Sequence, residues 1–301
     1  MQDRTNQYDY ARLIKEEKAH FADIEITREL KEGGVHSNSA WSFYWRGIAR
    51  ALAAGGFSNL PAYVCGRFPD ENRPLEVLSL ASGYCGHELD LARGMTRPYR
   101  ITCTELNEAI FKEAKTIAQA ESLTMDFREA DLNFMKIEPG RYDLIFAHAA
   151  IHHVINLEHL FDQIGGGLSP TGVLHMTEVV GKNRKLIWER NEQYANALLD
   201  LVPDRLTRGI RLAIKENVDG MEGIRQEDII PLLRERFVAL FEHRHGAFMR
   251  FICTHSELGP AFDPHDQGAR HALEFLIASD ENAVRAGFLA PLEIWGIYRP
   301  R

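Results

Sequence analysis

The stretch VLSLASGYCGHEL, residues 77–89, has the pattern of a buried strand, a turn of small residues and the start of a helix. In an open parallel sheet, ligands bind outside the carboxyl ends of the strands, and the backbone of such a turn must approach the ligand closely. Glycine permits this approach, so we take Gly83 as the key position, with Ala81 and Ser82 beside it. The stretch therefore predicts an α/β fold with a ligand site at the turn.

Outward from this stretch, short apolar runs alternate with helical patterns, which is typical of parallel strands joined by crossover helices. After Gly181 the alternation stops, and a helical stretch precedes the next strand. We therefore expect a doubly wound, mostly parallel seven-stranded sheet with an N-terminal helical extension and a helical cap insertion. The expected strands are 76–81, 100–104, 125–129, 142–147, 172–179, 237–244 and 291–298, and the clearest helices are 86–94, 107–120, 157–168 and 268–286.

This pattern divides the chain into four parts. Residues 1–66 form the helical extension, with amphipathic helices up to about residue 32, ended by Gly33-Gly34, and then an aromatic helix that Gly55-Gly56 ends. Residues 67–181 form the ligand-binding core, and residues 182–236 form the cap. Residues 237–301 complete the core sheet and carry an inserted helix.

Two acidic residues follow neighbouring strands of the predicted core. Glu105, followed by Leu106, comes about twenty residues after the turn, where a carboxylate accepts hydrogen bonds from both ribose hydroxyls of an adenosine ligand. Asp131, followed by Leu132, ends the third strand beside it and can accept a hydrogen bond from the adenine amine. The turn and Glu105 alone also fit a nicotinamide dinucleotide site, so an NAD-dependent oxidoreductase remains the alternative enzyme.

Five segments in this order resemble class I methyltransferases: VLSLASGYCG, TEL, EADLN, YDLIFAHAAIHHV and GGGLSPTGVLHMTEVVG, over roughly residues 75–180. The resemblance implies S-adenosylmethionine as cofactor, with its methionine part along Ala81, Ser82 and Gly83. It implies the ribose at Glu105 and Leu106, the adenine at Asp131 and Leu132, and His148 facing the methyl group. This sequence departs from the family in having Ser79 where many members have Asp, and Ala81 and Cys85 where glycine is common.

The later segments 181–205 and 219–233 are similar, more loosely, to uncharacterised methyltransferases of glycan and natural-product pathways. This similarity implies a small-molecule acceptor of the sugar, glycan or natural-product type. We expect methylation of oxygen or nitrogen, with a slight preference for oxygen. A module that binds the cofactor without turnover is the alternative that is not an enzyme.

Methyl transfer from a sulfonium needs a base only if the acceptor must lose a proton, and the enzyme otherwise positions and desolvates it. His148 and His152 are the candidate bases, because imidazole titrates near neutral pH, and His153 is more typical of packing. We predict no metal site, because the His148–His152 spacing lacks the glutamate and third ligand of a zinc motif.

The acceptor site is predicted from four further residues. Trp41 and Tyr44 belong to an aromatic helix that closes over the substrate or packs on the sheet. Glu178 ends the fifth strand, where it binds the acceptor or orients the following loop. Arg184 opens a locally basic stretch, 182–215, which faces an anionic substrate or is a solvated helix face.

Composition limits the remaining classes of function. The formal net charge is −8, so the molecule as a whole is a poor partner for nucleic acid. No apolar run is long enough to span a bilayer, and the polar start MQDRTNQYDY lacks the apolar core of a signal peptide. The four cysteines are scattered and are expected to be reduced. We therefore expect a cytoplasmic protein without membrane contacts, and keep a homodimer open.

Overall fold

The computed structural model describes residues 4–22, 38–57, 59–68, 70, 72–216 and 220–301. Its centre is one seven-stranded sheet with the order β3-β2-β1-β4-β5-β7-β6. The first five strands in this order are parallel, and β7 is antiparallel to both of its neighbours, β5 and β6. The strands are β1 (Leu75–Leu80), β2 (Tyr99–Glu105), β3 (Met125–Glu129), β4 (Tyr142–His148), β5 (Leu168–Val179), β6 (Phe237–His245) and β7 (Glu293–Pro300). The predicted mostly parallel, seven-stranded α/β fold is confirmed.

Apolar residues of the strands build a core on each face of this sheet, because successive side chains of a strand point to opposite faces. Val77 of β1 packs in one core, whereas its neighbour Leu78 packs in the other. Leu144 and Ile145 of β4 divide in the same way. Burial on both faces explains why these strands have continuous apolar runs instead of an alternating pattern.

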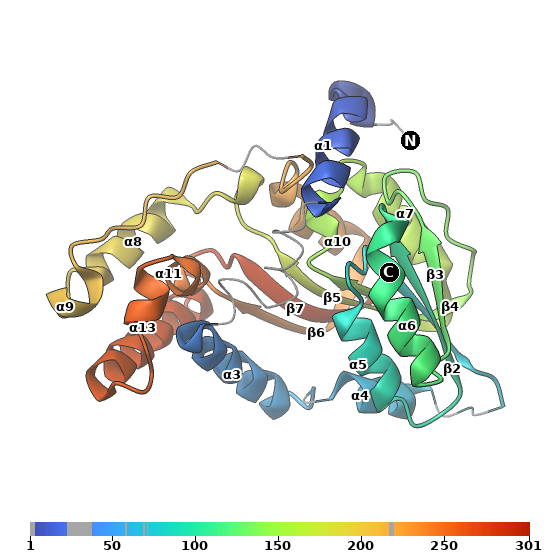
Figure 1. Ribbon diagram of the computed structural model, residues 1–301, viewed down its shortest axis with the longest axis horizontal. Helices are drawn as coiled ribbons and strands as arrows, with labels where there is room; N and C mark the ends of the chain where they lie inside the picture. The colour runs from blue at the N-terminus through green and yellow to red at the C-terminus, as the bar shows by residue number, and fades with distance from the viewer. Residues whose placement is uncertain (1–3, 23–37, 58, 69, 71, 217–219) are drawn as a thin grey trace.

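Helices cover both faces (Figure 1). The first face packs against α3 (Ser39–Ala54), α4 (Leu60–Arg67), α5 (Gly86–Gly94) and α6 (Lys112–Ala120), which follows η3 (Glu108–Phe111). The second packs against α7 (Leu157–Gly167), which follows η4 (Ile151–His153), and against α10 (Ile229–Arg236), which follows η6 (Gln226–Asp228). In the described part of the chain, no helix is long and apolar enough to cross a membrane.

The first part of the segment between β5 and β6 extends away from the sheet to one end of the molecule (Figure 1). It includes η5 (Asn183–Lys185), α8 (Glu189–Leu199) and α9 (Asp204–Thr207). Helices α8 and α9 share one apolar core with α3 and with three helices between β6 and β7: α11 (Met249–Thr254), α12 (Leu258–Ala261) and α13 (Gln267–Arg285). The helical group therefore combines segments from both halves of the sequence. The sequence did not predict α11 and α12.

The chain begins with η1 (Arg4–Gln7) and α1 (Tyr10–Ala22), which lies near the loops that follow the strands (Figure 1). Tyr10 binds Asp131, Lys18 is paired with Glu129 at 3.0 Å, and the Leu13 side chain is buried. The predicted continuation of the helices to residue 32 and the glycine pair at 33–34 lie outside the described residues.

Candidate functional site

The turn between β1 and α5 has an unusual backbone. Ala81, Gly83 and Cys85 have φ angles of 46°, 51° and 60°, in the left-handed region that favours glycine. A Cβ on Gly83 would meet no atom within 4 Å. The left-handed backbone conformation therefore explains why residue 83 is a glycine, and the space beside it is open to a ligand. Two of the three departures from the family pattern, Ala81 and Cys85, adopt the left-handed conformation that favours glycine.

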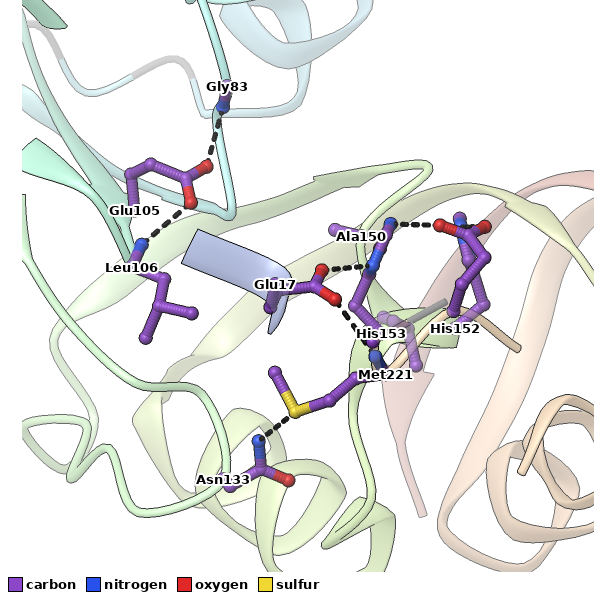
Figure 2. Close-up of polar contacts among 12 residues, drawn as sticks. Glu17, Gly83, Glu105, Leu106, Asn133, Ala150, His152, His153 and Met221 are labelled. Carbon is purple, nitrogen blue, oxygen red and sulfur yellow. Dashed lines mark hydrogen bonds and ion pairs between the residues drawn. The ribbon is translucent and has the colours of Figure 1, made fainter. Parts of the chain in front are cut away.

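The carboxylate of Glu105, at the end of β2, is bound to this turn (Figure 2). It accepts hydrogen bonds from the backbone N–H of Gly83 at 3.0 Å and of Leu106 at 2.7 Å. Burial raises the pKa of this carboxyl, and the two N–H donors oppose the rise. The contacts hold two neighbouring strand ends together and leave a hydrogen-bond acceptor in a ligand cavity.

Asp131 follows β3 and is held by side chains from two segments. Its Oδ2 accepts from the Tyr10 hydroxyl at 2.5 Å, and its Oδ1 accepts from the Asn133 backbone N–H at 2.9 Å. Leu132 beside it is buried. Helix α1 therefore fixes this carboxylate at the edge of the site.

One cavity of about 510 Å³ lies along the ends of these strands. This volume is in the range of about 300–1,000 Å³ that is typical of cofactor and small-molecule sites. All the residues predicted to bind the cofactor line it: Ala81, Ser82, Gly83, Glu105, Leu106, Asp131, Leu132 and His148. Carboxylates accept hydrogen bonds, so Glu105 and Asp131 suit a nucleoside, which presents ribose hydroxyls and an adenine amine as donors.

A family model described as "Methyltransferase domain" matches residues 77–172. This range extends from β1 into β5 and includes the turn, Glu105, Asp131 and His148. Residues 77–172 therefore form a methyltransferase domain. Its cofactor is S-adenosylmethionine, and the nicotinamide alternative is set aside.

Several solved structures are similar to this methyltransferase. The [4+2]-cyclase SpnF has 17% identity over 80% of each chain, with a TM-score of 0.46. A putative sarcosine dimethylglycine methyltransferase from Galdieria sulphuraria has 16% identity over 84% of each chain and a TM-score of 0.48. Coclaurine N-methyltransferase bound to N-methylheliamine and SAH has 13% identity over 80% of this chain and 69% of that chain, with a TM-score of 0.47. No curated protein matches the sequence.

His148 ends β4 and lies between two cavities of the methyltransferase. It lines the cofactor cavity and also a second cavity of about 310 Å³. Burial, together with the neighbouring His87, His175 and Arg250, holds the pKa of His148 well below its usual range. The imidazole is therefore neutral at physiological pH and accepts or donates a hydrogen bond without carrying charge.

The structure argues against the predicted role of His152 as a base. Its Nδ1 is bound to the Glu178 carboxylate, and its Nε2 lies 3.1 Å from Oε1 of Glu222. Burial alone would lower the pKa of His152, but the two carboxylates outweigh it and raise this pKa to about 9. A protonated imidazole between two carboxylates cannot accept a proton from an acceptor. His152 nevertheless lines the cofactor cavity.

Glu178, predicted to bind the acceptor, is buried and is absent from the cavity wall. Its carboxylate accepts hydrogen bonds from the backbone N–H groups of Ala150 at 3.0 Å, Ile151 at 2.7 Å and Val179 at 2.7 Å. These bonds, and the one with His152, fix the loop after β4. Glu178 is therefore a positioning residue, which was the alternative interpretation of its sequence position.

The other three predicted acceptor residues do not line the cofactor cavity either. Trp41 and Tyr44 are buried in the helical core, and the Tyr44 hydroxyl lies 3.3 Å from Nδ1 of His245. Packing therefore explains Trp41 and Tyr44, which was the alternative interpretation of the aromatic helix. Arg184 donates to the Gly220 carbonyl at 3.2 Å, while the next residue, Lys185, lines the cavity. Within the basic stretch 182–215, the residue that lines the cavity is thus one position later than predicted.

Sequence reasoning missed five charged residues of the cavity wall, namely Glu17, Lys18, Lys185, Glu222 and Arg250. They come from α1, η5, a turn before η6 and α11. A signal existed for Glu222 alone, because Gly220 and Gly223 flank it, with φ angles of 49° and 62°. Paired glycines indicate a tight turn, but they do not indicate what the turn presents.

Proposed function

We propose that this methyltransferase methylates a hydroxyl or amine of a small, uncharged acceptor bound in the second cavity, with oxygen preferred. The observation that carries the proposal is the position of His148 in the walls of both cavities. A donor in one cavity and an acceptor in the other meet at this side chain. The acceptor type remains that of sugars, glycans or natural products.

We place the cofactor by the chemistry of the wall of the first cavity. Glu105 accepts from the ribose hydroxyls, and Asp131 accepts from the adenine amine beside Leu132. The backbone at Ala81, Ser82 and Gly83 holds the methionine part, close to the end of β4. S-adenosylmethionine supplies a methyl group on a sulfonium, which is a good leaving group, so the protein has mainly to position and desolvate the acceptor.

The wall of the second cavity favours an uncharged acceptor. Its aromatic side chains come from Trp45, Phe57, Phe146 and Trp295. Within the described part of the chain, Asp90 is the single residue of the types Asp, Glu, Lys and Arg in this wall, and its side chain is 77% exposed. Planar or apolar molecules pack on such walls with little loss of solvation free energy.

Oxygen is preferred because the histidines of this wall are neutral. Burial lowers the pKa of His87 and lowers that of His175 to about 3, as it lowers the pKa of His148. A neutral imidazole at His148 accepts a hydrogen bond from an acceptor hydroxyl and orients its oxygen. Because the low pKa makes His148 a weak base, its main contribution is orientation.

The test measures binding and turnover separately. Calorimetric titration with S-adenosylmethionine and with NAD should give one cofactor site per chain for the first and none for the second. Assays for S-adenosylhomocysteine should then use phenols, sugars and secondary amines. Turnover with phenols or sugars exceeding that with amines supports the proposal. Cofactor binding without any turnover supports a binding module instead.

Substitution of one aromatic wall residue tests the location of the acceptor. Trp45→Ala should raise the acceptor KM and leave the cofactor Kd unchanged, because Trp45 lines the second cavity and does not line the cofactor cavity. The variant should keep the fold, because Trp45 is only half-buried. Phe275→Ala is the matched control, since this side chain is 43% exposed on α13 and lines neither cavity. An unchanged KM in Trp45→Ala places the acceptor elsewhere.

A further inference from the structure

Two adjacent histidines and one glutamate converge in the cofactor cavity. His152 and His153 belong to η4, and Glu222 lies in the turn before η6. Nε2 of His152 lies 3.1 Å from Oε1 of Glu222, and Nε2 of His153 lies 3.4 Å from its Oε2. One ligand atom from each of the three residues lies within 4.8 Å of the others, and all three residues line the cavity. Two imidazoles and a carboxylate form the triad that binds divalent transition metals with open positions.

Nδ1, the ring nitrogen of each histidine that does not face Glu222, is in contact with another carboxylate. Nδ1 of His152 is bound to Glu178, and Nδ1 of His153 lies 2.7 Å from Oε1 of Glu17 (Figure 2). A histidine that binds a metal almost always donates its other N–H to a carboxylate, a carbonyl or water, which fixes the ring and its tautomer. Both rings thus have an oriented Nδ1 and an Nε2 that faces the same carboxylate.

The charges around the triad also favour a cation. Three buried or nearly buried carboxylates surround the two rings, from Glu17, Glu178 and Glu222. Among the described ion pairs, Lys185 is the single lysine or arginine in contact with any of them, through Glu222. Buried carboxylates need cationic partners, and a dication between the histidines would supply them.

We propose that His152 Nε2, His153 Nε2 and the Glu222 carboxylate bind one divalent transition-metal ion, with Glu178 and Glu17 as the outer carboxylates. Lys185 leaves Glu222 and His152 releases its Nε2 proton to water when the ion binds, because only a neutral imidazole binds a metal. Imidazole and carboxylate ligands suit Zn²⁺, Fe²⁺ or Co²⁺ better than Mg²⁺, which prefers oxygen. The remaining coordination positions face the cavity and are open to water or a ligand oxygen. The site does not depend on the proposed acceptor.

The experiment uses the full chain, freed of metal with a chelator and titrated with Co²⁺ and with Zn²⁺. Calorimetry and the visible absorption of Co²⁺ should report one ion per chain. Glu222→Gln and His153→Ala should each weaken binding at least about 10-fold, and Glu178→Gln should weaken it about 10- to 100-fold. Lys185→Gln should strengthen binding, because it removes the competing ammonium group.

Matched controls and folding checks distinguish the loss of a metal ligand from the loss of the fold. Glu257→Gln and His271→Ala change the same residue types at exposed positions and should leave the metal Kd unchanged. Circular dichroism and thermal melting identify any variant that fails to fold, and such a variant is replaced by His153→Gln or Glu222→Ala. Absence of stoichiometric binding by the wild type overturns the proposal, as does an unchanged Kd in folded Glu222 and His153 variants. Cofactor binding is titrated separately, so a failure of the proposed function is distinguishable from a failure of the metal site.

Discussion

His148 and His87 stack face to face, with 3.8 Å between their ring centroids and 25° between their planes. His148 ends β4 and His87 lies in the first turn of α5, so the stack connects the carboxyl ends of two adjacent strands. His87 lines the second cavity, and His148 lines both cavities. The stack therefore restrains the imidazole that we place between donor and acceptor.

Removing this imidazole should affect turnover more than cofactor binding. We expect His148→Ala to lower kcat by up to about 10²-fold, the lower end of the range for a side chain that acts on an acceptor proton, because its lowered pKa makes it a weak base. The Kd for S-adenosylmethionine should change by less than about 3-fold, since Glu105 and Asp131 remain. Single-turnover kinetics and calorimetry measure the two effects. A wild-type kcat would remove His148 from the mechanism, and His271→Ala is the control.

Glu105 should carry much of the cofactor affinity. Glu105→Gln removes the charge from an acceptor that the proposal assigns to the ribose, which costs about 1.5–3 kcal/mol for hydrogen bonds to a charged group. The Kd for S-adenosylmethionine should then rise about 10- to 100-fold. Glu108→Gln, which removes a surface ion pair with Lys115, is the matched control and should leave the Kd unchanged. Equal affinities of the two variants would contradict the assignment.

Ala81 offers a test of backbone strain. A left-handed conformation costs an alanine roughly 1–2 kcal/mol, and glycine avoids this cost but loses about 0.5–1 kcal/mol more in conformational entropy on folding. Ala81→Gly should therefore raise the free energy of unfolding by up to about 1.5 kcal/mol. Ala53→Gly, in the exposed part of helix α3, should lower it by about 1 kcal/mol. Urea denaturation measures both changes, and a loss of stability in Ala81→Gly would contradict the strain.

Asp280 should make stability depend on pH. Burial raises its pKa to about 7, although Oδ1 accepts from the backbone N–H groups of Phe248 at 2.7 Å and Met249 at 3.2 Å. Because its pKa in the unfolded chain is about 4, the folded state binds more protons between pH 4 and 7. Its contribution to the free energy of unfolding is therefore most favourable below pH 4 and falls by about 4 kcal/mol as the pH rises to 7.

The substitution Asp280→Asn isolates this contribution, because the amide oxygen still accepts from the backbone and no longer titrates. The difference in unfolding free energy between variant and wild type should grow in favour of the variant from pH 4 to pH 7 and stay constant above it. Urea denaturation at several pH values measures this difference. A difference that is independent of pH would show that Asp280 stays ionised in the folded chain.

Sequence patterns located the strands well, and β1 and β4 were the clearest because strands buried on both faces are continuous apolar runs. The prediction of 125–129 agrees with β3, that of 76–81 is shifted by one residue from β1, and that of 142–147 ends one residue before β4 does. The expected helix 107–120 is divided into η3 and α6 at Lys112. Asn107 caps η3 by accepting from the Ala109 N–H at 3.1 Å, a local contact that helical periodicity does not show.

The site was predictable only where the sheet itself brings residues together. Gly83, Glu105 and Asp131 follow strands whose carboxyl ends meet, so topology alone places them along one cavity. Glu17 and Glu222 reach the same cavity through the packing of α1 and of a turn after β5, and no periodicity indicates that packing. The aromatic helix around Trp41 has the same pattern whether it packs in a core or covers a substrate.

The position of β7 has a consequence for how the chain acquires its fold. Among the described strands, β7 comes last in the sequence and lies between β5 and β6, and the edge strand β6 pairs with β7 alone. β6 must therefore wait, unpaired, until residues 293–300 have been synthesised and inserted beside it. A nascent chain arrested before that point would expose a free edge for association with other chains.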